Sequence, residues 1–356
     1  LPICKTVTTE FAAYHPGKTA NPHNPAHTPG GSSSGSAAAV ADGMVPLAYG
    51  TQTAASVIRP AAFCGVVGFK PGFGLISRAG VKPLAESLDT LGVFARDVAD
   101  AALFAGVLAG RNWQPPDTPA IPRIGVCRTS AWNQAELAAQ TAFEQAARQL
   151  AKHGAQISAV DLPAAFDDLV PAQIGIMAFE ASQSLHDEAV RHADRLSAPL
   201  QALIAQGQSM PPERYDECQQ QARACRGQLD AVFAGTDVLL TISAPGEAPE
   251  GLGATGNPLF SRLWTLLGVP CLHVPCAHGP RGLPLGVQVI GKAGGDYLDQ
   301  LDALLELYEF RPVSAREVQR RENLAAWLEK QAEAGFDAAV PAEVAARTRV
   351  VNYRDV

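Results

Sequence analysis

The sequence predicts an α/β fold in which a large mixed, mostly parallel sheet is flanked by helices on both faces. Residues 123–160 read as strand, helix and strand in succession, which is typical of parallel strands with helices on the sheet faces. A short apolar run at residues 45–50 is typical of a buried strand. With 356 residues, 47 % of them hydrophobic, the chain can bury a core large enough for such a fold.

Helix ends are indicated by capping residues. Ser34 or Ser36 can cap the first helix, and Gly43 can end it. Pro60 stands where the first turn of the second helix tolerates it, and Asp97 can cap the third. Helices are expected at residues 37–42, 57–65, 98–108, 134–153, 258–267 and 297–309, and residues 166–233 are expected to form a long helical region with a proline break.

Strand patterns separate these helices, and a glycine-punctuated, strand-like passage runs from residue 72 to Lys82. Residues 1–312 are expected to form one domain, followed by a charged, helix-prone tail at residues 313–356. Strands are expected at residues 1–8, 45–50, 90–95, 123–127, 156–160, 238–243, 271–275 and 285–290.

Composition excludes several classes of protein. A net charge of −7 and a pI near 5.6 argue against nucleic acid or an anionic membrane as the main partner. The sequence has no run of 18 apolar residues that would span a bilayer. Its seven scattered cysteines, without a C-x-x-C pair, favour reduced thiols and a cytoplasmic location. His15, His23 and His27 share one loop, but their spacing fits no metal-ligand template, so no metal is expected.

The sequence pattern that is most informative about catalysis or ligand binding lies at residues 28–60. A glycine- and serine-rich loop precedes a helix there, but no lysine follows Gly35 as a Walker A loop requires. A dinucleotide-binding loop should follow a strand, whereas this one follows a proline-rich coil. The G-x-S-x-G elbow of α/β-hydrolases is absent as well, since Ser56 stands between Ala54 and Ile58 in that register.

The stretch from Thr28 to Pro71 resembles the signature of the amidase signature family almost without interruption. It reads T-P-G-G-S-S-S-G-S-A-A-A-V-A, then P-L-A-Y-G-T-Q-T-A-A-S-V-I-R-P and G-V-V-G-F-K-P. The resemblance covers most of residues 1–312. It includes K-T-V-T-T-E-F-A, S-L-D-T-L-G-V-F-A-R, A-P-G-E-A-P-E-G-L, L-W-T-L-L-G-V-P and G-L-P-L-G-V-Q-V-I-G.

This resemblance implies a Ser–Ser–Lys hydrolase of amide bonds. Ser56 falls on the family's nucleophile position, and Ser32 falls on the bridging serine, which a cis peptide bond precedes in the family. A serine hydroxyl needs such a base-linked relay because it is inert at neutral pH. The backbone N–H groups of Thr53, Ala54, Ala55 and Ser56 would form the oxyanion hole.

Three further residues are expected near the substrate. Arg59, three residues after Ser56, is similar in placement to a substrate-carboxylate clamp of some family members, with a structural ion pair as the alternative. Gln52 and Ser33 are expected to contact the substrate, and Gln52, like Thr53, could instead orient the Ser56 turn through hydrogen bonds. The sequence departs from the family at Ala54 and Ala55, where glycine is usual; a positive φ there would cost about 1 kcal/mol.

The family's catalytic lysine has no counterpart in the sequence. It precedes the K-T-x-T-x-E-F-A stretch in the family, so Lys5, which lies within that stretch, does not match it. The sequence begins at Leu1 rather than methionine, and the lysine is therefore expected upstream of Leu1. A polypeptide that truly began at Leu1 would be inactive.

The function expected from these residues is hydrolysis of a small-molecule carboxamide to a carboxylate and ammonia or an amine, through a serine acyl-enzyme and without a cofactor. One alternative is the A-type subunit of glutamyl-tRNA amidotransferase, although that branch typically reads D-T-G-G-S where residues 52–56 read Q-T-A-A-S. Another is a catalytically dead homologue. Residues 166–233 and 246–257 are expected to form the substrate funnel, and residues 219–231 could instead serve a homodimer interface.

Overall fold

The computed structural model describes residues 4–111 and 122–292. The strands are β1 (Leu47–Gln52), β2 (Val67–Lys70), β3 (Thr90–Ala95), β4 (Arg123–Val126), β5 (Gln156–Ala159), β6 (Val238–Ile242), β7 (Cys271–His278) and β8 (Pro284–Ile290). The α-helices are α1 (Ser34–Ala41), α2 (Ile58–Cys64), α3 (Val98–Ala109), α4 (Leu137–Lys152), α5 (Leu169–Ser184), α6 (His186–Arg191), α7 (Ala198–Gln208), α8 (Pro212–Arg226), α9 (Leu229–Val232) and α10 (Leu259–Leu267).

One mixed sheet organises these elements, with the strand order β1-β3-β2-β7-β8-β6-β4-β5. The predicted α/β fold with a mixed sheet is confirmed, but the expectation of mostly parallel strands is wrong for the described strands. Only β4 pairs in parallel, with β5 and with β6, and the other five pairings are antiparallel. The cause is connection length: residues 279–283 join β7 to β8 as a tight hairpin, which cannot link parallel strands.

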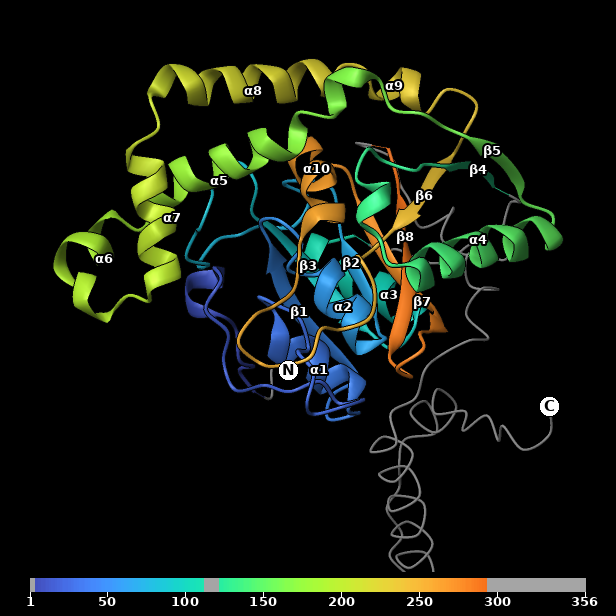
Figure 1. Cartoon of the computed structure of the whole chain (residues 1–356), viewed down its shortest axis with the longest axis horizontal. Coiled ribbons are helices and arrows are strands. Elements are labelled where there is room, and N and C mark those ends of the chain that lie inside the picture. The colour runs from blue at the N-terminus through green and yellow to red at the C-terminus, as the bar shows by residue number, and fades with distance from the viewer. Residues whose placement is uncertain (1–3, 112–121, 293–356) are drawn as a thin grey trace, which may run out of the picture. The chain divides into compact units, whose positions relative to one another are not determined.

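Helices cover both faces of the sheet, as predicted. Alternate residues of β6 show the two sides: Leu239 packs into a core with α5, α7, α8 and α10, whereas Leu240 packs into a second core with α3 and α4. Figure 1 shows α5, α7 and α8 gathered on one side of the sheet with α6 outermost, and α4 apart from them. The helical region predicted for residues 166–233 is thus a group of helices that covers one face.

Two glycines let α2 lie directly against the strands. A Cβ at Gly68 of β2 would come 2.5 Å from the Ala61 side chain, and one at Gly92 of β3 would come 2.9 Å from Val57. Real Cβ atoms do not approach other atoms this closely, so larger residues would push α2 away from the sheet. The start of α2 is therefore held at the sheet surface, immediately after Ser56.

Several predicted elements need correction. Residues 4–8 form no strand, residues 72–82 form turns, and the predictions overlooked β2. The strand at residues 90–95 is confirmed, and Asp97 caps α3 by accepting from the Asp100 N–H at 2.7 Å. The helix at 297–309, the tail at 313–356 and the boundary between domains lie outside the described residues.

All seven cysteines are free thiols, most of them buried. In the part of the chain that is described, no helix is long and apolar enough to cross a membrane.

Candidate active site

The turn that carries Ser56 joins the end of β1 to the start of α2. Gln52, fully buried at the end of β1, accepts from the Val57 and Ile58 N–H groups at 2.9 and 3.0 Å. Its amide nitrogen donates to Thr265 Oγ1 at 2.9 Å, and that hydroxyl donates to Ala54 O at 2.7 Å. Gln52 therefore braces both sides of the turn, which was one of the two roles expected of it.

Four consecutive backbone N–H groups at this turn have no hydrogen-bond partner among the described residues. Across residues 4–111 and 122–292, no acceptor pairs with the N–H groups of Thr53, Ala54, Ala55 or Ser56. Buried N–H groups are almost always paired, so consecutive unpaired ones next to a serine hydroxyl form a ready site for a negatively charged oxygen. Neither Ala54 nor Ala55 has a positive φ, so the alanines at these positions cause no backbone strain.

Ser32 lies in the loop before α1 and follows a cis peptide bond, Gly31–Ser32, as the resemblance implies. Its carbonyl accepts from the Thr9 N–H at 3.2 Å and the Thr8 hydroxyl at 3.1 Å. Its own hydroxyl is buried and has no hydrogen-bond partner among the described residues. The loop is thus fixed through its backbone, and the Ser32 hydroxyl takes no part in fixing it.

Ser33 has a different environment from Ser32. Its hydroxyl lies 3.3 Å from both the N–H and the carbonyl of Thr51, at the end of β1. It does not line the pocket described below. These contacts connect the serine-rich loop to β1, and they support an orienting role rather than contact with the substrate.

Arg59 connects the two serine-bearing segments. Its guanidinium donates to Gly31 O, the carbonyl of the cis peptide, at 2.8 Å from Nη2 and 3.3 Å from Nε. Its Nη1 donates to Gly256 O in the loop before α10. Burial, and secondarily the charge of Arg262, lower the pKa of Arg59 to about 9, so it remains a cation at neutral pH.

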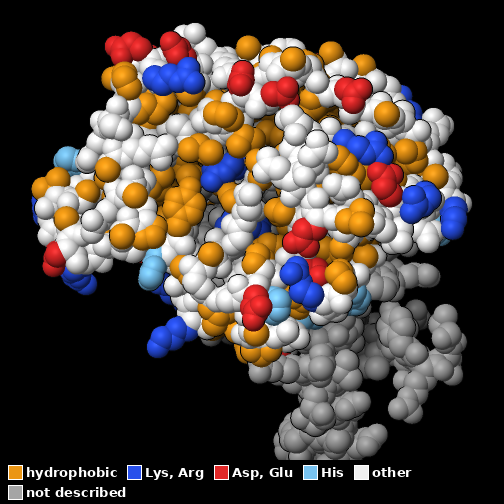
Figure 2. Space-filling view, viewed as in Figure 1, with side chains coloured by type: hydrophobic (Ala, Val, Ile, Leu, Met, Phe, Trp, Pro, Cys, Tyr) orange, Lys and Arg blue, Asp and Glu red, His pale blue; other side chains and the backbone are white. Residues whose placement is uncertain are grey.

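A pocket opens at Ser56. Its wall combines apolar side chains from the helical region with the cations of α2 and α10, which is the usual composition of a small-molecule site. In Figure 2, Lys or Arg side chains (blue) show inside a hollow among hydrophobic side chains (orange). The lining residues are Ala12, Ala13, Tyr14, Thr53, Ala54, Ser56, Arg59, Leu84, Met177, Leu203, Pro258 and Arg262.

Two residues that the sequence reasoning missed hold Thr53 in place. Asp89 accepts from the Thr53 hydroxyl and from the Leu84 N–H at 2.8 Å, and burial raises the pKa of this carboxyl. Gln173 of α5 donates to Thr53 O at 2.9 Å. Asp89 could have been found from the S-L-D-T-L-G motif in which it stands. For Gln173 the only indication in the sequence is that a polar residue stands within an otherwise apolar helix.

Two of the three histidines of the N-terminal loop, His23 and His27, hold it in place through their side chains. His23 Nε2 lies 2.9 Å from Cys64 O, and His27 Nδ1 lies 2.7 Å from Ala248 O. In the described part of the chain, no three His, Cys, Asp or Glu residues group as a metal site would require. No described lysine lines the pocket; the buried Lys70 donates to Pro71 O at 2.8 Å instead.

Comparison with known proteins identifies the family to which the chain belongs. The sequence profile of the Amidase family matches residues 1–298. The chain belongs to the amidase family. Its membership makes it an amide-hydrolysing enzyme.

Individual relatives agree at the level of family and fold. The chain is 36 % identical over 332 residues to the A-type subunit of glutamyl-tRNA(Gln) amidotransferase from Synechococcus sp. (strain WH7803), covering 80 % of this chain and 67 % of that protein. A solved structure titled "Crystal structure of amidase" matches with a TM-score of 0.78 at 28 % identity, over 85 % of this chain and 74 % of the other. Native peptide amidase from Stenotrophomonas maltophilia matches with a TM-score of 0.73 at 26 % identity, over 87 % and 74 %.

Proposed function

We propose that this amidase hydrolyses small-molecule carboxamides through an acyl-enzyme on Ser56. The observation that carries the proposal is the row of unpaired N–H groups at residues 53–56, beside a serine hydroxyl that opens into the pocket. The placement of Ser32 supports it, because Arg59 binds the peptide before Ser32 from the helix that follows Ser56. A carbonyl oxygen held by residues 53–56 would present its carbon to Ser56.

In the proposed reaction, Ser56 Oγ attacks the amide carbon and its proton passes through the Ser32 hydroxyl to a base. Negative charge that develops on the carbonyl oxygen is stabilised by the N–H groups of Thr53, Ala54, Ala55 and Ser56, each worth about 3 kcal/mol in comparable sites. The C–N bond then breaks and the amine leaves with the proton. Water next attacks the ester, which releases the carboxylate and restores Ser56.

Removal of the nucleophile tests this assignment. Ser56→Ala should lower kcat about a thousandfold or more, and Ser32→Ala should lower it strongly with a smaller effect on KM. Both are compared with Ser209→Ala, which removes an exposed hydroxyl of the helical region. The measurements are amide hydrolysis by protein made from its complete reading frame, and labelling by a fluorophosphonate detected as a mass increase.

The outcomes separate the alternatives. Labelling of the wild-type protein but not of Ser56→Ala supports an activated nucleophile at that position. Retained hydrolysis in Ser56→Ala would place the nucleophile elsewhere. A wild-type protein that neither hydrolyses amides nor takes up the label would be the catalytically dead homologue.

A second candidate is the A-type subunit of a glutamyl-tRNA amidotransferase. The observation in its favour is the 36 % identity over 80 % of this chain to a relative that bears that name. The stretch Gln52-Thr53-Ala54-Ala55-Ser56 argues against it, because that branch typically has D-T-G-G-S at these positions. Co-purification with RNA and a second protein, together with hydrolysis of glutamine only in that complex, would favour the amidotransferase.

A further inference from the structure

The Ser56 turn is held by its carbonyl groups. The carbonyls of residues 53, 54 and 55 each accept a hydrogen bond, and the donors are, in chain order, Gln173 Nε2 at 2.9 Å, Thr265 Oγ1 at 2.7 Å and the Arg59 N–H at 2.9 Å. The peptide bonds that follow these carbonyls are trans, so each carbonyl points away from the N–H of the next residue. Binding of the carbonyls on one side therefore turns the N–H groups of residues 54, 55 and 56 to the other side.

Gln173 is the one of these three donors that comes from the helical region. It is fully buried in α5 and stands 120 positions along the chain from Thr53. It is not among the residues that line the pocket. The hydrogen bond from Gln173 to Thr53 O can therefore influence a substrate through the turn, and not by direct contact with it.

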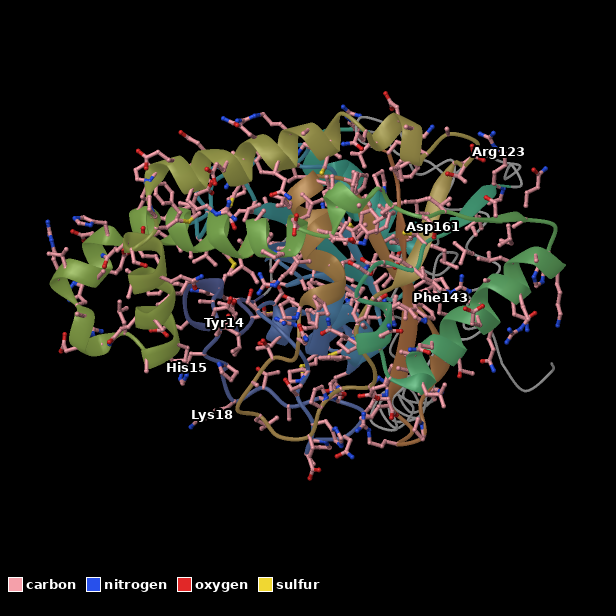
Figure 3. All side chains as sticks on the ribbon, turned by 45° about the horizontal axis from the view of Figure 1, so that its top comes forward. Tyr14, His15, Lys18, Arg123, Phe143 and Asp161 are labelled. Atoms are coloured by element: carbon pink, nitrogen blue, oxygen red, sulfur yellow. The ribbon has the colours of Figure 1, made fainter. Side chains whose placement is uncertain are left out.

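Arg262 of α10 fixes the orientation of the Gln173 amide. Arg262 Nη1 donates to Gln173 Oε1, and Arg262 Nη2 lies 3.4 Å from the hydroxyl of Tyr14, which Figure 3 labels on the N-terminal segment. A guanidinium group only donates hydrogen bonds, and a backbone carbonyl only accepts them. The amide oxygen of Gln173 must therefore face Arg262, and its nitrogen must face Thr53 O. A glutamine joins these two groups, whereas a glutamate has no donor and a methionine has neither group.

The charge of Arg262 strengthens this arrangement. Arg262 is only 6 % exposed, and within the described ranges it forms no ion pair with a carboxylate. A buried charge is costly unless hydrogen bonds compensate it. A hydrogen bond from a charged donor is stronger than one from a neutral donor, and it polarises the next bond in a chain. The Gln173 amide is therefore a stronger donor to Thr53 O than an isolated amide would be.

We propose that Gln173, held by Arg262, is a positioning residue that sets the plane of the peptide between Thr53 and Ala54, so that the Ala54 N–H points at the carbonyl oxygen of the amide under attack. The inference rests on the proposed function, since it concerns how that oxyanion site is oriented. Donors that already point at the developing charge stabilise it without turning during the reaction. The loss of this orientation should therefore lower kcat more than it changes KM.

Removal of the Gln173 amide is the first test. Gln173→Met keeps the length of the side chain but leaves Thr53 O and Arg262 Nη1 without their partner. We expect kcat to fall about 10- to 100-fold, below or at the effect of deleting an oxyanion donor outright, with KM changed less than about threefold. The measurements are amide kinetics and the melting temperature of each variant.

Gln173→Glu separates positioning from a merely structural role. The carboxylate can form an ion pair with Arg262, so the melting temperature should stay above that of Gln173→Met. It cannot donate to Thr53 O, and its second oxygen repels that carbonyl, so kcat should fall at least as far as in Gln173→Met. If kcat instead followed the melting temperature in the two variants, the role of Gln173 would be structural. Gln173→Glu also replaces Gln173→Met in the test if the methionine variant does not fold.

Gln288→Met is the matched control. Gln288 is also fully buried, and its Nε2 donates to Ile242 O and Phe260 O at 2.8 Å each, neither of which belongs to the Ser56 turn. This variant should lower the melting temperature and leave kcat unchanged. A fall in kcat as large as that of Gln173→Met would show that any loosening of the core slows the reaction, and the inference would be overturned.

The part played by Arg262 is tested in a double variant. Arg262→Met should lower kcat, and its combination with Gln173→Met should add little further loss, because both changes act on the same peptide. Losses that multiply in the double variant would show that Arg262 does not act through Gln173.

Crystal structures of wild-type protein and Gln173→Met test the orientation itself. The peptide between Thr53 and Ala54 should be turned in the variant. An unchanged peptide, or an unchanged kcat, would overturn the inference. If the wild-type protein hydrolyses no amide, the proposed function fails, and the two crystal structures still decide whether Gln173 orients this peptide.

Discussion

Gln52 makes the position of Ser56 depend on a single buried amide group. Its oxygen accepts from the first N–H groups of α2, and its nitrogen reaches Thr265 of α10. The unsatisfied N–H groups at a helix start usually bind a capping side chain from the preceding turn, and Gln52 supplies that cap from the end of β1 instead. The turn is thereby rigid without any contact to the Ser56 hydroxyl itself.

Replacement of Gln52 by methionine tests how far stability and catalysis depend on the hydrogen bonds of this side chain. Gln52→Met keeps the volume but leaves two buried N–H groups without an acceptor, so the free energy of unfolding should fall by about 2–4 kcal/mol. Because the Ser56 turn loses its brace, kcat should also fall, about 10-fold or more. Urea unfolding and amide kinetics measure the two effects. Gln149→Met on the exposed face of α4 is the control and should change neither.

Single residues show what a motif can and cannot predict. The cis peptide before Ser32 was predicted because it accompanies an uninterrupted motif. The roles of Gln52 and Arg59 were left open between substrate binding and structure, and Ser33 was expected to bind substrate, since the contacts of each depend on segments far apart in the chain. Arg262 was overlooked, although it stands in the apolar run L-F-S-R-L-W-T-L-L. Arginine is rarely buried without a polar partner, so its position in such a run indicates a buried charge with specific contacts.

At the scale of elements, the close packing of α2 on β2 and β3 determines where the Ser56 turn lies. Gly92 has Phe69 O within 2.7 Å and Val57 within 2.9 Å of the position that a Cβ would take. Gly50 of β1 is the cross-strand partner of Gly92, and a Cβ there would meet the Ser33 hydroxyl. The serine loop and the nucleophile turn therefore both lie against strand positions that have no side chain.

Gly92→Ala should displace α2 and with it the Ser56 turn. We expect the free energy of unfolding to fall by about 1–3 kcal/mol, as for overpacked cores, because Phe69 O is backbone and cannot rotate away. Amide turnover should decrease with it. Gly253→Ala is the matched control: this glycine has a negative φ or an extended one and open space around its Cβ position, so stability and turnover should not fall. Unchanged turnover in a destabilised Gly92→Ala protein would show that catalysis does not depend on the position of α2.

Capping signals predicted some helix ends and not others. Asp97 caps α3 as predicted, because a cap acts within a few residues. Ser34 and Ser36, expected to cap the first helix, instead lie inside α1, which begins at Ser34. The strand-like passage at residues 72–82 was wrong, since its glycines serve turns there rather than strand positions. Strand direction was inferred from the one βαβ unit at residues 123–160, whereas direction elsewhere depends on which distant strands pair.

At the scale of the whole sheet and its helices, buried hydrogen bonds join the helices that cover the pocket side of the sheet to the loop before β3. Glu180 of α5 accepts from the Ser87 N–H at 2.8 Å and from the Tyr215 hydroxyl of α8 at 2.8 Å. Ser87 precedes Asp89, which holds Thr53. The helical region is thereby connected through one loop to the nucleophile turn, so that the pocket and the core are stabilised by the same contacts.

His273 makes the stability of this core dependent on pH. It is fully buried in β7, 2.7 Å from the Ser243 hydroxyl, and burial lowers its pKa from 6.5 to about 3. The folded protein therefore keeps the imidazole neutral where the unfolded chain would already be protonated. The stabilisation is fully present above pH 6.5 and is lost as pH falls from there towards 3, at about 1.4 kcal/mol per pH unit.

Urea unfolding at pH 7.5 and pH 5.0 checks this dependence. Between these pH values the wild-type protein should lose about 2 kcal/mol more of its free energy of unfolding than His273→Gln does, because the variant has no imidazole to protonate. Burial raises the pKa of Asp89, which acts in the opposite direction, but Asp89 is present in both proteins and cancels in the comparison. His186→Gln, at an exposed position in α6, should behave as the wild type. An equal pH effect in the wild type and His273→Gln would show that His273 titrates in the folded protein as it does in the unfolded chain.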